Sequence, residues 1–166
     1  MQKITPFLWF NDQGEEAAEY YVSVFNGRPG VSSDRGSKVL NVTRYGEAGP
    51  GTPGTAMTAS FVLEGLEFTA LNGGPEFAFT EATSFQVSCG SQDEVDHFWK
   101  ALTDGGEESQ CGWLKDRYGL SWQIIPTALH TLLGDPDPGR AGRAIKAMLQ
   151  MQKIDIAAME QAADSA

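Results

Sequence analysis

The sequence predicts an α+β protein made of two βαβββ units and a C-terminal helical tail. The first observation is an internal repeat: moving the chain by 78 residues against itself places Tyr20-Tyr21 on Phe98-Trp99 within a shared pattern. The second is that each copy reads as a strand, an amphipathic helix, a glycine and three strand-like runs. The third is the helical composition after residue 126. We expect one domain, divided into unit one (1–75), unit two (80–126) and a tail (127–166).

Each unit begins with a short strand followed by a helix. Strands are expected at residues 4–10 and 83–89, which are rich in aromatic and β-branched side chains. Helices are expected at 14–25 and 91–103, where apolar residues recur at helical spacing. Ser91 is the predicted N-cap of the second helix because its hydroxyl can accept from the first turn.

Three strand-like runs follow each helix. They lie at 38–45, 55–63 and 66–72 in unit one, and at 107–111, 113–117 and 120–125 in unit two. Glu64-Gly65 is typical of a tight hairpin turn between two of them. With a helix on one sheet face, each unit leaves the other face free to contribute to a cleft.

The tail predicts a short helix at 127–133 and helical structure from 139 to 163, with Asp155 as the cap of a separate last helix. It carries an apolar stripe whose members are Ile145, Met148, Leu149, Met151, Ile154 and Met159. Two interpretations are open, packing within the chain or a contact between two chains. Left exposed, the stripe would exceed what monomers usually tolerate, so we expect a homodimer.

Composition excludes several classes of protein. The chain has 12 basic and 22 acidic residues and a net charge of −10, which disfavours nucleic acid as a partner. No apolar run approaches the length that spans a membrane, and the first residues lack a signal-peptide core. Two cysteines, Cys89 and Cys111, cannot build a disulfide framework, so a cytoplasmic location is expected.

Paired βαβββ units of this length resemble the vicinal oxygen chelate superfamily, which includes glyoxalase I, the bleomycin-resistance proteins and the extradiol dioxygenases. Within it, the chain is similar to the PhnB-like family, often labelled 3-demethylubiquinone-9 3-methyltransferase. The segments that carry this resemblance are residues 6–11, 17–25, 71–75, 111–126 and 151–158. The resemblance covers nearly the whole chain and implies the glyoxalase-type fold and a homodimer.

The methyltransferase label does not fit the glycine pattern. An ordinary enzyme that uses S-adenosylmethionine has a glycine-rich turn leading from a strand into a helix. The candidates here are Gly49-Pro50-Gly51 and Gly73-Gly74-Pro75, and neither opens an amphipathic helix. We therefore regard methyl transfer as the less favoured alternative.

The resemblance also implies a divalent metal held by the first and last strands of each unit. Aligning those strands puts the ligand positions at Pro6, Thr69, Ser84 and Gln123. Only Gln123 has a suitable donor, whereas a catalytic ion usually has three ligands of imidazole or carboxylate type. His97 and His130 lie outside the strands. We predict no metal and no other cofactor.

Alternation along the strands predicts which side chains face the cleft. They are Leu8, Phe10, Thr69, Leu71, Ser84, Gln86, Ser88, Ser121 and Gln123. This wall, part apolar and part neutral polar, suits a small organic ligand. The alternative is that Gln86 and Gln123 only satisfy each other and buried water. Glu67 at the rim and Cys111 are weaker candidates for chemistry, as a base and as a reactive thiol.

The favoured function is therefore metal-independent binding of an unidentified small molecule, as in the bleomycin-resistance proteins. One alternative is a metal-dependent lyase, isomerase or dioxygenase of the same superfamily. The other is the methyl transfer that the family label names. No catalytic residue set is identified.

Overall fold

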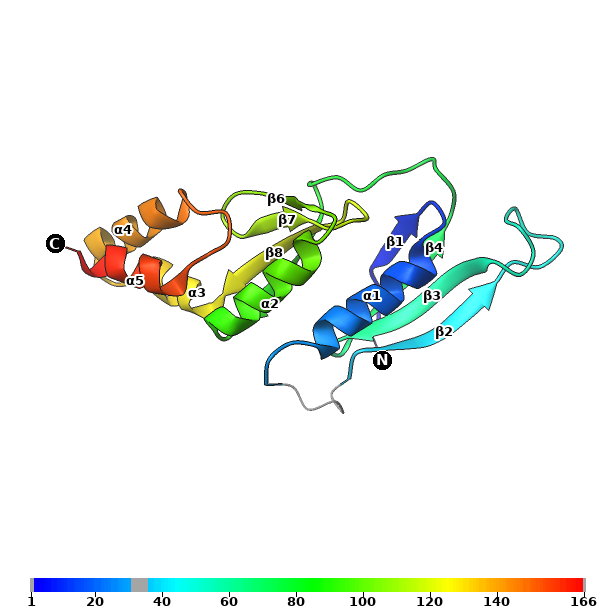
Figure 1. Ribbon diagram of the computed structural model, residues 1–166, viewed down its shortest axis with the longest axis horizontal. Helices are drawn as coiled ribbons and strands as arrows, with labels where there is room; N and C mark the ends of the chain where they lie inside the picture. Colours follow the sequence, from blue (N-terminus) through cyan, green and yellow to red (C-terminus); the bar gives the residue numbers. More distant parts are fainter. Residues whose placement is uncertain (1, 31–35, 166) are drawn as a thin grey trace. The chain divides into compact units, whose positions relative to one another are not determined.

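The computed structural model describes residues 2–30 and 36–165. The chain forms two compact units, Met1–Phe79 and Thr80–Ala166, each with a four-stranded sheet and a helix on one sheet face (Figure 1). The predicted α+β architecture with two βαβββ units is confirmed. We call these unit one and unit two, and the tail is part of the second. Among the described residues, no helix has the length and apolar character needed to cross a membrane.

Unit one consists of β1 (Phe7–Phe10), α1 (Gly14–Asn26), β2 (Lys38–Arg44), β3 (Ala56–Leu63) and β4 (Leu66–Asn72). Its strands lie in the order β1-β4-β3-β2, and β1 runs parallel to β4. Helix α1 covers one face, where Tyr21 stacks on Phe61 and Phe61 stacks on Phe68. The predicted hairpin is present: Glu64 and Gly65 have φ values of 49° and 86°, and a two-residue turn of this kind needs positive φ at both positions.

Unit two repeats this order with β5 (Ser84–Cys89), α2 (Gln92–Thr103), β6 (Glu107–Glu108), β7 (Trp113–Lys115) and β8 (Ser121–Pro126). The sheet order is β5-β8-β7-β6, with β5 parallel to β8. Ser91 is the N-cap, because its Oγ accepts from the backbone N–H of Glu94 at 3.3 Å. Strand β6 is shorter than predicted because Cys111 and Gly112 adopt positive φ and end its pairing with β7. Strand β7 ends at Lys115 because the chain turns at Asp116, whose carbonyl accepts from the backbone N–H of Gly119 at 2.9 Å.

The tail forms α3 (Thr127–Leu133), α4 (Pro138–Met148) and α5 (Ile156–Asp164). The predicted helical stretch is therefore interrupted between α4 and α5. Asp155 caps α5 as expected, since its Oδ1 accepts from the backbone N–H of Ala158 at 2.9 Å. The turn before α5 also ties the tail to β7: the backbone N–H groups of Cys111 and Gly112 donate to the carbonyls of Met151 and Gln152, each at 2.8 Å.

The apolar stripe of the tail packs mainly within unit two. Ile154 and Met159 are fully buried, and Met148 and Met151 pack against the same cluster, which also includes Ile125 at the end of β8. The other two members of the stripe, Ile145 and Leu149, are 39% and 53% exposed. Packing within the chain thus accounts for four of its six residues, and the stripe is not the large exposed patch on which the dimer argument rested.

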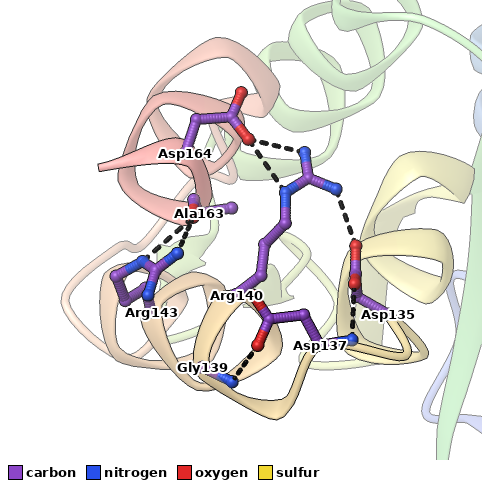
Figure 2. Close-up of polar contacts among 7 residues, drawn as sticks. All are labelled: Asp135, Asp137, Gly139, Arg140, Arg143, Ala163 and Asp164. Carbon is purple, nitrogen blue, oxygen red and sulfur yellow. Dashed lines mark hydrogen bonds and ion pairs between the residues drawn. The ribbon is translucent and has the colours of Figure 1, made fainter. Parts of the chain in front are cut away.

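Two arginines on α4 hold the last helix in place (Figure 2). Arg140 contacts Asp135 through Nη1 at 2.6 Å and Asp164 through Nε at 2.8 Å. Arg143 donates from Nε and Nη2 to the carbonyl of Ala163, at 2.9 and 2.6 Å. Asp135 also accepts from the backbone N–H of Asp137, and this bond and Arg140 hold the pKa of Asp135 below its usual value.

Candidate functional site

The open face of the unit-two sheet, opposite α2, carries the predicted polar side chains. Strand pairing aligns Ser84 with Ser121 and Gln86 with Gln123, and Ser88 follows on the same side of β5. The alternating residues Val87, Cys89, Trp122 and Ile124 are buried under α2. The structure therefore brings Ser84, Gln86, Ser88, Ser121 and Gln123 together on one face. That they bind a ligand stays a prediction.

Two of these side chains are paired across the strands. Gln123 Nε2 donates to Ser84 Oγ at 2.8 Å, in a half-buried setting. Gln86 Nε2 lies 3.5 Å from Ser88 Oγ on the exposed part of β5. Gln123 thus takes a serine as its partner, rather than Gln86. This bond holds the Gln123 amide in place through its nitrogen, and the amide oxygen takes no part in it.

In unit one the predicted face of two residues was wrong. Leu8 and Phe10 are only 6% and 4% exposed, and Leu8 aligns with Ala70 on the side covered by α1. Phe7 is 61% exposed and aligns with Thr69, and Trp9 aligns with Leu71. The open face of unit one therefore carries Phe7 and Trp9 beside the predicted Thr69 and Leu71, while Leu8 and Phe10 belong to the core.

The length of one turn explains the difference. β1 ends at Phe10 and α1 begins at Gly14, so three residues separate them, whereas only two separate Cys89 from Gln92. Successive strand residues point to opposite faces, so one additional residue exchanges the faces of the strand relative to the helix. The helices of the two units correspond at a spacing of 78 residues, but their first strands correspond at 79.

Trp9 shows how the open face of unit one is built. Its Nε1 donates to the carbonyl of Gly74 at 2.9 Å, and its ring meets Phe77 edge to face at 5.0 Å. Gly73 makes room for the indole, because a Cβ at this position would lie 2.3 Å from Trp9 Cζ2. The Gly73-Gly74 pair therefore has a packing role next to an aromatic surface.

Unit one also contains a cavity of about 800 Å³ beside the first turn of α1. Its polar side chains bond to one another: Arg44 holds both carboxylate oxygens of Glu15, at 2.9 and 3.2 Å. Tyr45 Oη donates to the carbonyl of Asn72 at 2.6 Å, and Asn72 Oδ1 accepts from the backbone N–H of Gly14 at 2.7 Å. These bonds fix the start of α1 to the sheet.

A smaller cavity of about 120 Å³ lies in unit two, lined by Trp113, Lys115 and Ser121 together with acidic residues of β6 and Glu81. Lys115 Nζ contacts Glu81 at 2.5 Å. This hydrogen-bonded pair lowers the pKa of Glu81 and raises that of Lys115. Sequence patterns did not indicate this group, because Glu81 and β7 meet only in the folded unit.

Asp116 is a second feature that sequence reasoning missed. It is 3% exposed, and its Oδ1 accepts from the backbone N–H groups of Tyr118 and Leu120 at 2.8 and 3.1 Å. Its Oδ2 accepts from Trp122 Nε1 at 2.9 Å. Asp116 thereby fixes the turn before β8 and positions the start of that strand, including Ser121.

The family follows from comparison with known proteins. A family model described as 3-demethylubiquinone-9 3-methyltransferase matches residues 2–125. The chain belongs to this family. A PhnB protein from Bacillus cereus, provisionally described by the same activity, is 35% identical over 76% of this chain and 100% of its own, with a TM-score of 0.65.

More distant structures share the fold of this PhnB-like family. Protein PA1353 from Pseudomonas aeruginosa is 20% identical over 76% of this chain and 98% of its own, with a TM-score of 0.59. The fosfomycin resistance protein FosX from Mesorhizobium loti is 9% identical over 75% of this chain and 92% of its own, with a TM-score of 0.50. These two likenesses show the shared fold alone. No curated protein matches the chain significantly.

The metal positions that the resemblance implies have donors that fit a metal poorly. Thr69 corresponds to Gln123 by strand pairing, as predicted, but the counterpart of Ser84 is Thr5 rather than Pro6. These are neutral hydroxyl and amide groups, and Gln123 and Ser84 bond to each other. Within residues 2–30 and 36–165, no three His, Cys, Asp or Glu side chains are grouped so that they could hold a metal ion.

The remaining candidates lie on different elements of the fold. His97 is on α2 and exposed His130 is on α3. Glu67 is exposed, and its backbone bonds to the side chain of Gln2. Cys111 Sγ lies 3.7 Å from the carbonyl of Met148, against the tail. This position favours the packing interpretation of Cys111 over a reactive thiol.

Proposed function

We propose that this PhnB-like protein binds a small organic molecule on the open face of unit two and that binding needs no metal. The observation that carries the proposal is the pair Gln123 and Ser84, with Ser121 next to it in the strand register. Neutral amide and hydroxyl groups recognise ligands by hydrogen bonds, whereas divalent ions prefer imidazole and carboxylate donors.

The face also limits the ligand's chemistry. Trp113 aligns with Gln123 across β7 and β8 and offers an apolar surface beside the polar groups. A ligand with an apolar body and one or two hydrogen-bonding groups matches this combination. Because the chain carries a net charge of −10, neutral or cationic ligands are favoured over anions.

Benzamide is a suitable probe, since it joins a flat apolar ring to one amide. We expect it to shift the backbone amide NMR signals of β5 and β8 in ¹⁵N-labelled protein treated with a chelator. Gln123→Ala is expected to weaken binding at least about threefold, in line with the loss of one hydrogen bond. Gln161→Ala, on the exposed surface of α5, is the matched control and should leave the affinity unchanged.

Adding a metal ion or S-adenosylmethionine distinguishes our proposal from the two alternative functions. If benzamide binds only after Zn²⁺ or Mn²⁺ is restored, the protein is a metal-dependent member of its superfamily and our proposal is wrong. The family description makes methyl transfer the second candidate, so S-adenosylmethionine is titrated under the same conditions. The described residues of the two units form no doubly wound parallel sheet of the kind that binds this cofactor in ordinary methyltransferases, so we expect no saturable binding.

A further inference from the structure

The Ser121 hydroxyl is buried without a hydrogen-bond partner. The residue is 1% exposed. Among the buried side-chain oxygen and nitrogen atoms of the described residues, its Oγ is the one without a hydrogen-bond partner. Burying a hydroxyl without a partner is unfavourable by about 1–3 kcal/mol, so such groups call for an explanation. Replacing it by a methyl group would remove that penalty, which makes its presence informative.

The strand register places this hydroxyl at the cavity of about 120 Å³. Ser121 aligns with Lys115 on β7, and Lys115 aligns with Glu107 on β6, so the three side chains share the open face of the sheet. All three line the cavity. Its volume exceeds what a single water requires by roughly a factor of ten, so a group of several heavy atoms fits.

The cavity is negatively charged. Glu81 and Glu107 contribute two carboxylates and Lys115 contributes one ammonium group, which leaves one negative charge. Lys115 is held by Glu81. Glu108 takes no part in this charge, because its side chain lies on the other face of the sheet, where Oε1 accepts from Trp99 Nε1 of α2 at 2.7 Å. A cation that enters would meet the Glu107 carboxylate on one side and the Trp113 ring on another.

Building on the proposed ligand face of unit two, we propose that this cavity receives a primary ammonium or amidinium group. The N–H donors of that group bond to Ser121 Oγ, and the Glu107 carboxylate balances its charge. A short carbon chain of the ligand lies against Trp113. The same ligand therefore spans from the cavity toward Ser84 and Gln123, because Ser84 is the register partner of Ser121.

Three probes of equal carbon chain length test the charge preference: propylammonium, 1-propanol and propanoate, at constant ionic strength. The readout is the indole N–H signal of Trp113, identified with Trp113→Phe. We expect saturable shifts with propylammonium, weaker binding of 1-propanol and none of propanoate. Equal affinity for the three probes, or tighter binding of propanoate, would overturn the proposal.

Ser121→Ala tests the hydroxyl. We expect the affinity for propylammonium to fall about five- to tenfold, as for the loss of one hydrogen bond to a charged group, while the melting temperature stays unchanged or rises. The matched control is Ser23→Ala, which removes an exposed hydroxyl from α1 in unit one and should change the affinity less than about twofold. Unchanged affinity in Ser121→Ala would contradict the proposal.

Benzamide separates this inference from the proposed function. If benzamide shifts β5 and β8 while propylammonium does not bind, only the ammonium site is wrong. If neither probe shifts the open face of unit two, the proposed ligand face is wrong as well.

Discussion

The two units bury similar cores but present different open faces. Under the helices, Tyr21 and Phe61 in unit one correspond in role to Trp99 and Trp122 in unit two. On the open side, unit one carries aromatic side chains, including the 61% exposed Phe7, whereas strands β5 and β8 of unit two carry serine and glutamine. The repeated pattern therefore specifies the fold, and the residues between its apolar positions distinguish the chemistry of each face.

The largest expected effect concerns the shared core. Trp99 is 5% exposed and donates from Nε1 to Glu108 Oε1. Trp99→Ala is expected to lower the free energy of unfolding by about 3–5 kcal/mol, because it leaves a cavity under the sheet. Urea denaturation measures this loss. Trp99→Phe keeps most of the packing and should lose clearly less, and an unchanged stability in Trp99→Ala would mean that the face of α2 is assigned wrongly.

The next prediction tests the open face of unit one. Leu8→Ala is expected to lower the free energy of unfolding by about 2–5 kcal/mol, since Leu8 is in the core. Phe7→Ala, one residue away, should change it by about 1 kcal/mol or less because the ring is mostly exposed. The same denaturation experiment compares the two variants. A larger loss of stability in Phe7→Ala than in Leu8→Ala would support the face of β1 first predicted from the sequence.

A smaller, pH-dependent effect is expected in the tail. The pKa of Asp135 is lowered by the backbone N–H of Asp137 and by Arg140, so the folded carboxylate binds protons less readily than the unfolded one. Its stabilising contribution is present above the ordinary pKa of 3.8 and is lost as the pH falls through the folded value. The protection factors of the amides in α4 and α5, which correct for the intrinsic exchange rate at each pH, should therefore fall toward acid pH before those in α1 do. Asp135→Asn should reduce this pH dependence, and an identical response in both proteins would contradict it.

The homodimer remains a proposal, but it now rests on different exposed residues. The tail stripe is largely covered within unit two, whereas Phe7 and Phe77 in unit one are 61% and 63% exposed. We expect light scattering at micromolar concentration to give twice the chain mass of 17.9 kDa. A mass of one chain would exclude the dimer, and a dimer that persists in Phe7→Glu would move its interface away from this residue.

Local patterns were sufficient to predict the elements but not all of the faces. Helix spacing, the Ser91 cap and the Glu64-Gly65 turn depend on residues close in sequence, and they were predicted correctly. Residues 7–10 are all apolar, so alternation of polar and apolar residues cannot show which side chains of β1 face the helix. The longer turn before α1 determines that face. In β5, by contrast, polar and apolar residues alternate, and the predicted faces were right.

Other features depend on contacts distant in sequence. The stripe of the tail is covered by α3, α5 and Ile125, which no periodicity reveals. The bonds of Asp116 and the pairing of Lys115 with Glu81 exist only once the turn before β8 and the segment before β5 have folded. The unpartnered hydroxyl of Ser121 is likewise visible only in the folded unit.

Metal analysis of the protein purified without chelators tests the central claim most directly, namely that the open face of unit two is a ligand site without a metal. Elemental mass spectrometry is applied to the wild-type protein and to Gln123→Ala. We predict far less than one Zn, Ni, Mn or Fe per chain in both proteins, with benzamide binding retained in the wild type. A stoichiometric metal that is lost in Gln123→Ala would contradict this claim and favour the metal-dependent alternative.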